Sequence, residues 1–299
     1  MRPFLDRIRQ GEVLVADGAM GTMLFQRGLK PTDCPESVSL TRPELLEEIA
    51  TEYLEAGADI VQTNTFGGSP LNLVKYGLDD KTEMINRSAV DAVREAVDGL
   101  AYVSASVGPS GRILAPYGDI EPNAVWESFR RQIKTLVDAG ADIICVETMT
   151  DIAEARLAIQ ATRSVSPTIP IMATMTYDET PRGFYTIMGI DIPTAVRELT
   201  LAGADLVGSN CGYGIEKMVQ VARAYRACGR MPLVIQSNAG LPVMEDGRPV
   251  YREAPEFMAE KGKELVAIGV SVIGGCCGTT PAHIAAIRKM VDSLRPPSG

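Results

Sequence analysis

The chain contains the stretch Ala56-Gly57-Ala58-Asp59-Ile60, and near copies of it recur. Two copies are Ala139-Gly140-Ala141-Asp142-Ile143 and Ala202-Gly203-Ala204-Asp205-Leu206, and Ile268-Gly269-Val270-Ser271-Val272 is a degraded fourth. The glycine suits the left-handed position that ends a helix, and the residues after it suit the start of a strand. The repeat therefore predicts four equivalent helix-to-strand junctions.

A proline stands upstream of each copy, at a position suited to the first turn of a helix. The prolines are Pro43, Pro122, Pro193 and Pro255, at 14, 18, 10 and 14 residues before the repeat glycine. These lengths differ by steps of four residues, about one helical turn. Helix length can therefore change while the inward face is kept. The chain divides into four quarters of two strand–helix units each.

Eight short apolar runs rich in β-branched residues predict strands. They are residues 13–19, 59–66, 101–109, 142–149, 169–177, 204–211, 232–240 and 270–278. Segments with helical spacing lie between them, for example residues 44–56, 82–97, 123–139 and 256–268. Strands that alternate with helices imply a parallel sheet with helical crossovers, and eight units predict a single (β/α)8 TIM barrel over residues 1–299.

An open doubly wound sheet is the alternative fold. It favours a Gly-x-Gly-x-x-Gly turn after the first strand, and this chain has Asp17-Gly18-Ala19-Met20-Gly21-Thr22 there, which does not match. The long Gly- and Pro-containing segment 110–121 is expected to be a loop that covers the barrel mouth.

The composition narrows the function classes. Hydrophobic residues make up 45% of the 299 residues, enough for a large core, and the net charge of −9 argues against a nucleic-acid surface. No apolar run approaches the roughly 20 residues of a membrane helix, and the N-terminus has no apolar signal region. We therefore expect a soluble, cytoplasmic protein. With His283 as its single histidine, a Ser/His/Asp triad or a histidine-rich metal site is not expected.

Three of the six cysteines lie at the ends of two predicted strands. Cys211 ends one, and Cys276 and Cys277 stand in Gly274-Gly275-Cys276-Cys277-Gly278 at the end of another. Active sites of barrels lie at the carboxyl ends of the strands. Neighbouring strand residues point to opposite faces, so both thiols reach one ion only if the glycines break the strand. Three thiolates plus an open position predict a catalytic zinc site.

The alternative for Cys276 and Cys277 is a buried apolar pair or a strained vicinal disulfide. The other cysteines, Cys34, Cys145 and Cys228, are interpreted as structural, with Cys145 in the core.

Two predicted strand ends carry carboxylates, Asp17 and Glu147. Two negative charges at a barrel mouth suit a substrate ammonium group, and the backbone amides of the turn that begins with Gly18 and Ala19 suit its carboxylate. Together they predict a site that holds an amino acid by both ends. A plain Asp-Gly turn for Asp17 and a structural salt bridge for Glu147 are the alternatives.

Two asparagines, Asn64 and Asn238, lie at the ends of further strands and are also predicted to bind substrate. Asn238 would hydrogen-bond the substrate or occupy the open metal position, with a turn role as the alternative. Further on, Thr279-Thr280-Pro281 predicts a helix cap, and His283 is interpreted as a surface residue of that helix.

Several of these segments resemble the homocysteine S-methyltransferase family, over nearly the whole chain. They are residues 17–22, Thr63-Asn64-Thr65-Phe66-Gly67-Gly68, Gly108-Pro109-Ser110-Gly111, Glu147-Thr148, Asn210-Cys211 and residues 274–281. Within the family, the chain is most similar to the homocysteine-binding module that opens cobalamin-dependent methionine synthase. The resemblance implies a zinc-binding barrel in which Cys211, Cys276 and Cys277 hold the metal, while Asp17 and Glu147 contact homocysteine.

The chain ends after the barrel, without the folate- and corrinoid-binding modules of the full synthase. We therefore expect methylcobalamin to be supplied in trans by a separate corrinoid protein that docks over the mouth. S-methylmethionine and betaine are the alternative donors. Residues 182–189 are bulkier than the Ser/Thr-Gly-rich stretch expected there, so the thiol and the donor stay open at this point.

Two other classes of protein are alternatives to a methyltransferase. A structural zinc protein would have no use for carboxylates at an open mouth, which Asp17 and Glu147 supply. A thiol–disulfide oxidoreductase would favour Cys-x-x-Cys spacing, which Cys276 and Cys277 lack. In the methyltransferase reading, zinc removes the proton from a thiol that is mostly protonated at neutral pH, so no general base is required.

Overall fold

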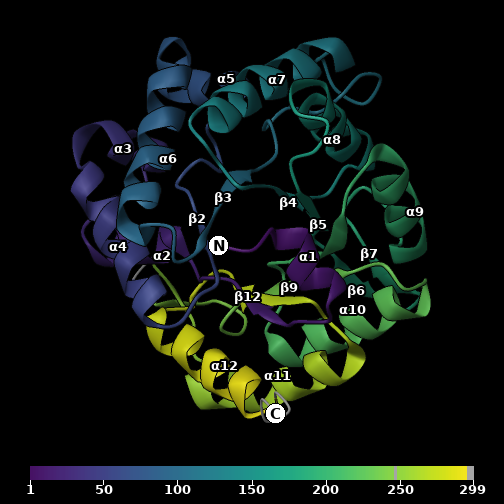
Figure 1. Ribbon diagram of the computed structural model, residues 1–299. Helices are drawn as coiled ribbons and strands as arrows, with labels where there is room; N and C mark the ends of the chain where they lie inside the picture. The colour runs from purple at the N-terminus through teal and green to yellow at the C-terminus, as the bar shows by residue number, and fades with distance from the viewer. Residues whose placement is uncertain (246–247, 295–299) are drawn as a thin grey trace.

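Eight parallel strands form the centre of the computed structural model, which describes residues 1–245 and 248–294 (Figure 1). In chain order they are β1 (Leu14–Val15), β2 (Ile60–Gln62), β3 (Tyr102–Val107), β4 (Ile143–Met149), β5 (Ile171–Met175), β8 (Leu206–Asn210), β9 (Leu233–Ser237) and β12 (Val272–Gly275). Each lies within one of the eight predicted runs.

The strands close into a barrel. Their hydrogen-bonded order is β1-β12-β9-β8-β5-β4-β3-β2, with every pair parallel. Ala16 forms a parallel bridge with Ile60, and the Asp17 N–H donates to the Ile60 carbonyl at 3.0 Å, which joins the first strand to the second. The predicted (β/α)8 barrel is confirmed, and the open-sheet alternative is wrong.

Helices surround this barrel, as Figure 1 shows. They are α1 (Phe4–Arg9), α2 (Met20–Gln26), α3 (Val38–Thr41), α4 (Pro43–Glu55), α5 (Pro70–Leu73), α6 (Thr82–Val97), α7 (Pro122–Asp138), α8 (Ile152–Val165), α9 (Ile192–Ala202), α10 (Ile215–Ala227), α11 (Pro255–Ile268) and α12 (Pro281–Ser293). None of the helices in the described residues is long and apolar enough to cross a membrane.

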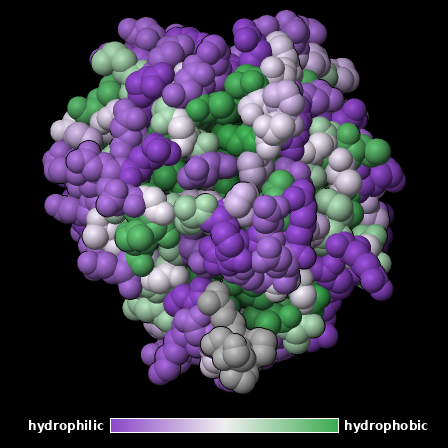
Figure 2. All heavy atoms as spheres, viewed as in Figure 1, coloured by the Kyte–Doolittle hydropathy of each residue, from purple (hydrophilic) through white to green (hydrophobic). Residues whose placement is uncertain are grey.

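Helix α1 covers the amino-terminal end of the barrel. It lies in front of the strands in Figure 1, and its Phe4 and Ile8 pack against inward-facing strand residues such as Leu14 and Ile60. Figure 2 shows the same face, where hydrophilic residues predominate and apolar ones form scattered patches. Cys145 belongs to the same inner cluster and is fully buried, as expected of a core residue. The opposite, carboxyl end of the strands is the mouth.

The repeat has the structure that its sequence predicts. The glycines Gly57, Gly140, Gly203 and Gly269 have φ of 91°, 94°, 110° and 86°, and each follows the end of a helix. The repeat aspartates have a role that the sequence pattern did not reveal. One carboxylate oxygen of Asp59, Asp142 and Asp205 accepts at 2.9 Å from the backbone N–H of Val15, Val103 and Ile171, respectively, at the start of the neighbouring strand. The carboxylates therefore fix the register at the bottom of the barrel.

Two short hairpins were not predicted. Strands β6 (Asp178–Thr180) and β7 (Gly183–Tyr185) form one after β5, and β10 (Val243–Glu245) and β11 (Arg248–Val250) form the other after β9. The bulky segment 182–189 is therefore partly a strand. Strands of three residues give too short a pattern for periodicity to detect.

The start of α12 confirms one prediction and corrects another. Thr280 is the N-cap and Pro281 the first residue of α12, as predicted. His283, however, is 7% exposed and is not a surface residue. Its Nδ1 takes part in the capping box with Thr280, and its Nε2 lies 2.9 Å from the Glu253 carbonyl oxygen. The imidazole is held by backbone and cap groups, which buries it.

Candidate metal and substrate site

Three thiols converge at the mouth of the barrel. Cys211 directly follows β8, and Cys276 and Cys277 directly follow β12. The sulfur atoms of all three lie within 4.8 Å of one another, and those of Cys211 and Cys277 are 3.8 Å apart. All six cysteines are free thiols in this structure, so Cys276 and Cys277 do not form a vicinal disulfide here. The three sulfurs are placed to hold one metal ion.

The backbone achieves this convergence differently from the prediction. Cys211 itself adopts a left-handed conformation, with φ of 62°, and Gly278 does so with φ of 82°. Gly274 and Gly275 are needed for space. A β-carbon on Gly274 would lie 2.8 Å from the Ala16 β-carbon, and one on Gly275 would lie 2.2 Å from the Thr279 Oγ1. Strand β12 ends at Gly275 and the backbone turns at Gly278, while Gly274 and Gly275 allow close packing.

The electrostatics of the thiols favour a metal. Hydrogen bonds from Cys276 and Cys277 lower the pKa of Cys211 well below its ordinary value. The same interactions raise the pKa of Cys276, so one sulfur of the cluster carries negative charge while its neighbours keep their protons. A metal ion that binds thiolates would displace those protons. Three sulfur donors at one point fit zinc, which accepts such a set with a fourth position open.

Tyr251 lines the cluster, and the sequence reading missed it. A β-carbon on Gly278 would lie 2.2 Å from the Cγ atom of the Tyr251 ring, so the ring lies directly on the glycine after Cys277. Burial and the neighbouring Cys277 raise the pKa of Tyr251, so the phenol keeps its proton. Because Tyr251 comes from the segment after β11, no spacing to the cysteines could have revealed it.

Asp17 lies at the end of β1, only 1% exposed. Its Oδ2 accepts from the backbone N–H of Gln62 at 2.7 Å, and its Oδ1 has no hydrogen-bond partner in the structure. Burial, with a further contribution from the charge of Glu147, raises the pKa of Asp17 to about 8. A buried carboxylate oxygen without a partner is a place where a cationic ligand would bind.

Glu147 lies near the end of β4 and is 6% exposed. Its Oε1 accepts a short hydrogen bond from the Ser106 hydroxyl, and its Oε2 accepts from the Asn210 Nδ2 at 3.4 Å. Burial raises the pKa of Glu147 to about 7. Glu147 has no cationic side-chain partner among these contacts, which argues against the structural salt bridge considered above. Ser106 could have been noticed as a serine that interrupts an aliphatic strand.

The remaining predicted site residues have mixed surroundings. Asn64 donates from Nδ2 to the Pro35 carbonyl at 2.7 Å, which ties the loop after β2 to the segment before α3. Asn238 keeps a buried Oδ1 without a partner, and its side chain helps to lower the pKa of Cys211. The Ala19 N–H donates to the Thr279 Oγ1 at 3.2 Å, and Gly18 packs against that hydroxyl. Asn238 is therefore beside the thiols, whereas Asn64 has a structural contact.

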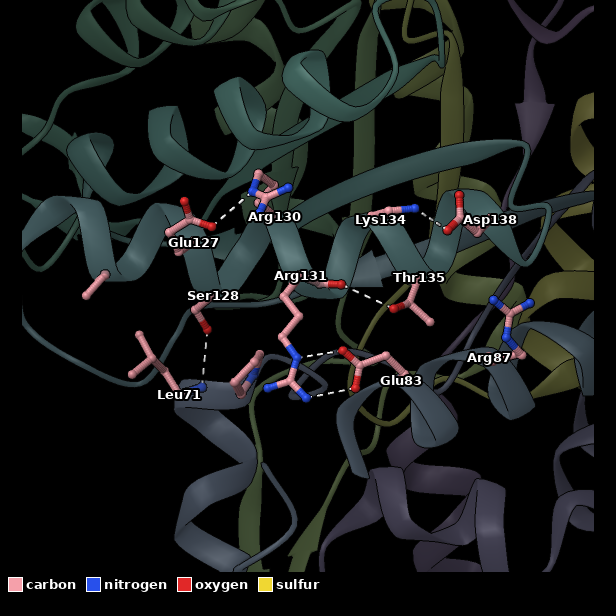
Figure 3. Close-up of a pocket in the computed structure, with 12 residues that line it drawn as sticks. Leu71, Glu83, Arg87, Glu127, Ser128, Arg130, Arg131, Lys134, Thr135 and Asp138 are labelled. Carbon is pink, nitrogen blue, oxygen red and sulfur yellow. Dashed lines mark hydrogen bonds and ion pairs between the residues drawn. The ribbon is translucent and has the colours of Figure 1, made fainter. Parts of the chain in front are cut away.

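Two cavities in the described residues lie away from this cluster. One, of about 560 Å³, lies on the outer surface between α6, α7 and the start of α5 (Figure 3). Its charges are largely paired, as in Arg131 with Glu83 at 2.6 Å and Lys134 with Asp138 at 2.6 Å. The other lies beside α1 at the covered end of the barrel. Neither contains the thiols or carboxylates of the mouth.

Comparison with known proteins identifies the family of the chain. The family profile described as homocysteine S-methyltransferase matches residues 14–291. The chain is 34% identical over 310 residues to methionine synthase of Mycobacterium tuberculosis, covering 98% of this chain and 26% of that protein. It is 34% identical to methionine synthase of Mycobacterium leprae, covering 95% and 25%. The chain thus spans about a quarter of the length of these curated relatives.

A solved structure extends the likeness to the whole barrel. The metallated form of the homocysteine methyltransferase MmuM from Escherichia coli superposes with a TM-score of 0.81 at 25% identity, covering 96% of this chain and 99% of that one. The family match, the two relatives and the shared barrel agree with one another. The chain belongs to the homocysteine S-methyltransferase family.

Proposed function

We propose that this barrel binds zinc and homocysteine at its mouth and transfers a methyl group to the homocysteine thiol. Cys211, Cys276 and Cys277 hold the metal, and Asp17 and Glu147 bind the ammonium group. The observation that carries the proposal is the meeting of three sulfurs within 4.8 Å of one another, at the same strand ends as two buried carboxylates.

In the proposal, different groups of the site bind the thiol end and the amino-acid end of the substrate. When bound, zinc supplies a thiolate at neutral pH, because coordination lowers the pKa of a thiol. Asp17, whose Oδ1 has no hydrogen-bond partner, and Glu147 bind the ammonium group, which favours their ionised forms, and so orient the amino acid. In the proposal the Gly18 amide faces the substrate carboxylate, whereas the Ala19 N–H already donates to the Thr279 Oγ1 at 3.2 Å. Tyr251 packs on Gly278, beside Cys277.

The donor in our proposal is a methylated corrinoid carried by a separate protein that docks over the mouth. The transfer forms a sulfur–carbon bond and breaks the methyl–cobalt bond, whose electron pair stays on the corrinoid. Support comes from the 34% identity to two methionine synthases over nearly the whole chain, which exceeds the 25% identity to MmuM. In the proposal, the corrinoid is presented to the mouth of the barrel from outside the described residues.

A donor assay tests this proposal. Zinc-loaded protein is incubated with homocysteine and, separately, with free methylcobalamin, a methylcorrinoid protein, S-methylmethionine or betaine, and methionine is measured. We expect zinc-dependent methionine formation with a corrinoid. Methionine from S-methylmethionine or betaine, with both corrinoid forms inert, would contradict the donor and leave the thiol site in place. No methionine from any donor would contradict the proposed activity.

A further inference from the structure

Asn210, the last residue of β8, lies between the carboxylate proposed for the ammonium group and the thiol cluster. We propose that Asn210 is a positioning residue that couples these two halves of the site. It holds Glu147 in place and donates an N–H···S hydrogen bond to Cys276. The inference rests on the proposed function, because it assigns Glu147 to the ammonium group and Cys276 to the metal.

The orientation of the Asn210 amide is determined by its neighbours. Its Oδ1 lies 2.8 Å from the backbone nitrogen of Thr148 and 2.7 Å from the Oγ1 of Thr174. A backbone N–H can only donate, so the amide oxygen has to face Thr148. The Nδ2 group consequently points the other way, toward Glu147 and the thiols.

The Nδ2 group has two hydrogens and three acceptors. It lies 2.7 Å from the Thr148 Oγ1, 3.4 Å from the Glu147 Oε2 and 3.8 Å from the Cys276 sulfur. The short contact takes one hydrogen, so the carboxylate and the sulfur share the other. One N–H therefore links the group that would bind the ammonium to a sulfur that would bind the metal.

The same amide holds an unusual piece of backbone. Thr148 has φ of 59°, in the left-handed region where a β-branched residue is strained, and the β4–β5 register shifts between Val146 and Met149. Asn210 bonds both the backbone N–H and the hydroxyl of Thr148. By holding this bulge, it fixes the direction of the preceding residue, Glu147.

Burial makes these contacts hard to replace. Asn210 is 0% exposed, so water cannot readily take over its hydrogen bonds. It also directly precedes Cys211, the other strained residue of the site, whose φ is 62°. Loss of the amide should therefore disturb the ammonium site and the metal site together.

The test compares two properties of Asn210→Ser with those of the wild type. The first is discrimination, the dissociation constant of 4-mercaptobutyrate divided by that of homocysteine, since the former lacks only the amine. We expect discrimination to fall about fivefold or more. The second is zinc affinity by chelator competition, and it should fall about tenfold, as for other groups that orient metal ligands. The Asn210→Ser change made in a Glu147→Gln protein should alter discrimination by less than about twofold.

Thr174→Val is the matched control. It removes the hydroxyl that donates to the Asn210 Oδ1 and leaves every Nδ2 contact in place. We expect both quantities to stay within about twofold of wild type even if the melting temperature falls. The inference is contradicted if either quantity in Asn210→Ser stays within about twofold of wild type. A wild-type protein without any discrimination would instead contradict the proposed function.

A measurement on the wild type covers the case in which Asn210→Ser does not fold. The chain has six asparagines, so selective ¹⁵N labelling gives few side-chain amide signals. In protein loaded with ¹¹³Cd, we expect a scalar coupling between the metal and a side-chain amide proton of Asn210, transmitted through the N–H···S hydrogen bond. The lack of such a coupling at Asn210 would contradict the bond to Cys276.

Discussion

Two buried carboxylates, Asp17 and Glu147, are the residues that we propose bind the ammonium group of an amino acid at the mouth. Their pKa values rise to about 8 and about 7 mainly because burial disfavours their charged forms. Neither accepts a hydrogen bond from a cationic side chain of the described residues, and the Asp17 Oδ1 has no hydrogen-bond partner. Together they make a site that an ammonium group would complete.

Asp17→Asn tests that role, because it keeps the shape and removes the charge. A charge-assisted hydrogen bond is worth about 1.5–3 kcal/mol, so homocysteine affinity should fall by roughly 10- to 100-fold. Affinity for 4-mercaptobutyrate, measured by the same titration calorimetry, should change little. Equal losses for both thiols would mean that Asp17 acts on the fold or on the metal.

The raised pKa values also predict a dependence on pH. A carboxyl group with a raised pKa binds its proton more tightly in the folded protein than in the unfolded chain. Its contribution to stability is full below about pH 4 and is lost as the pH rises through 7 to 8. An ammonium group favours the ionised carboxylates and so opposes this loss.

Homocysteine binding at pH 7 should therefore release more protons than binding of 4-mercaptobutyrate, whose thiol loses the same proton at the metal. Calorimetry of zinc-loaded protein in buffers of different ionisation enthalpy gives the two proton counts. Identical counts would show that the carboxylates do not respond to the ammonium group.

The metal ligands are tested by substitution of single thiols. Cys276→Ala removes one of three converging sulfurs, so the zinc content of purified protein should drop from about one per chain to a small fraction. The melting temperature should change little, because the apolar core is separate from the mouth. Cys228→Ala, at an exposed thiol outside the site, is the control and should keep its zinc. Full zinc content in Cys276→Ala would refute the ligand assignment.

At the scale of elements, the site depends on how strands β8 and β12 end. Gly278 has φ of 82°, and a β-carbon there would meet the Tyr251 ring at 2.2 Å. Gly278→Ala should lower the free energy of unfolding by about 1–3 kcal/mol. It should also weaken zinc binding, because the turn after Cys277 would shift.

Gly11→Ala supplies the comparison for that change. Gly11 has φ of 78°, and a β-carbon there meets nothing within 4 Å. The Gly11→Ala variant should lower the melting temperature only through the strain of an alanine in the left-handed region. Its zinc affinity should be unchanged. If the two alanine variants lose zinc affinity equally, the packing of Tyr251 on Gly278 has no part in the metal site.

The sequence was informative about elements where a pattern is long or repeated. The repeat around Gly57 located the helix ends, and helix α6 was predicted with its observed bounds. The hairpins after β5 and β9 were not predicted, because three-residue strands have almost no periodicity. The left-handed backbone conformation of Cys211 was not predicted, because a non-glycine residue in that conformation leaves no signal in the sequence.

The candidate site was predictable only in part, for a related reason. Cys211, Cys276, Cys277, Asp17 and Glu147 lie at strand ends, and barrel geometry brings strand ends together. Their roles toward metal and substrate remain predictions. Ser106 and Tyr251 were missed because their importance comes from contacts across strands and loops. Such contacts depend on tertiary packing, and spacing along the chain does not show them.

At the scale of the whole molecule, the barrel separates stability from chemistry. Helix α1 and an apolar inner cluster fill the amino-terminal end, while thiols and carboxylates gather at the mouth. The repeat aspartates Asp59, Asp142 and Asp205 hold strand register at the covered end. Strain and unpaired polar atoms can therefore persist at the mouth, because the other end holds the fold.

The central claim is that three cysteines hold a zinc ion whose fourth position takes the substrate sulfur. X-ray absorption at the zinc edge, recorded before and after addition of homocysteine, tests it most directly. The account predicts about three sulfur neighbours in the free protein and about four with homocysteine. A count that stays at three, or fewer than three sulfurs in the free protein, would contradict it.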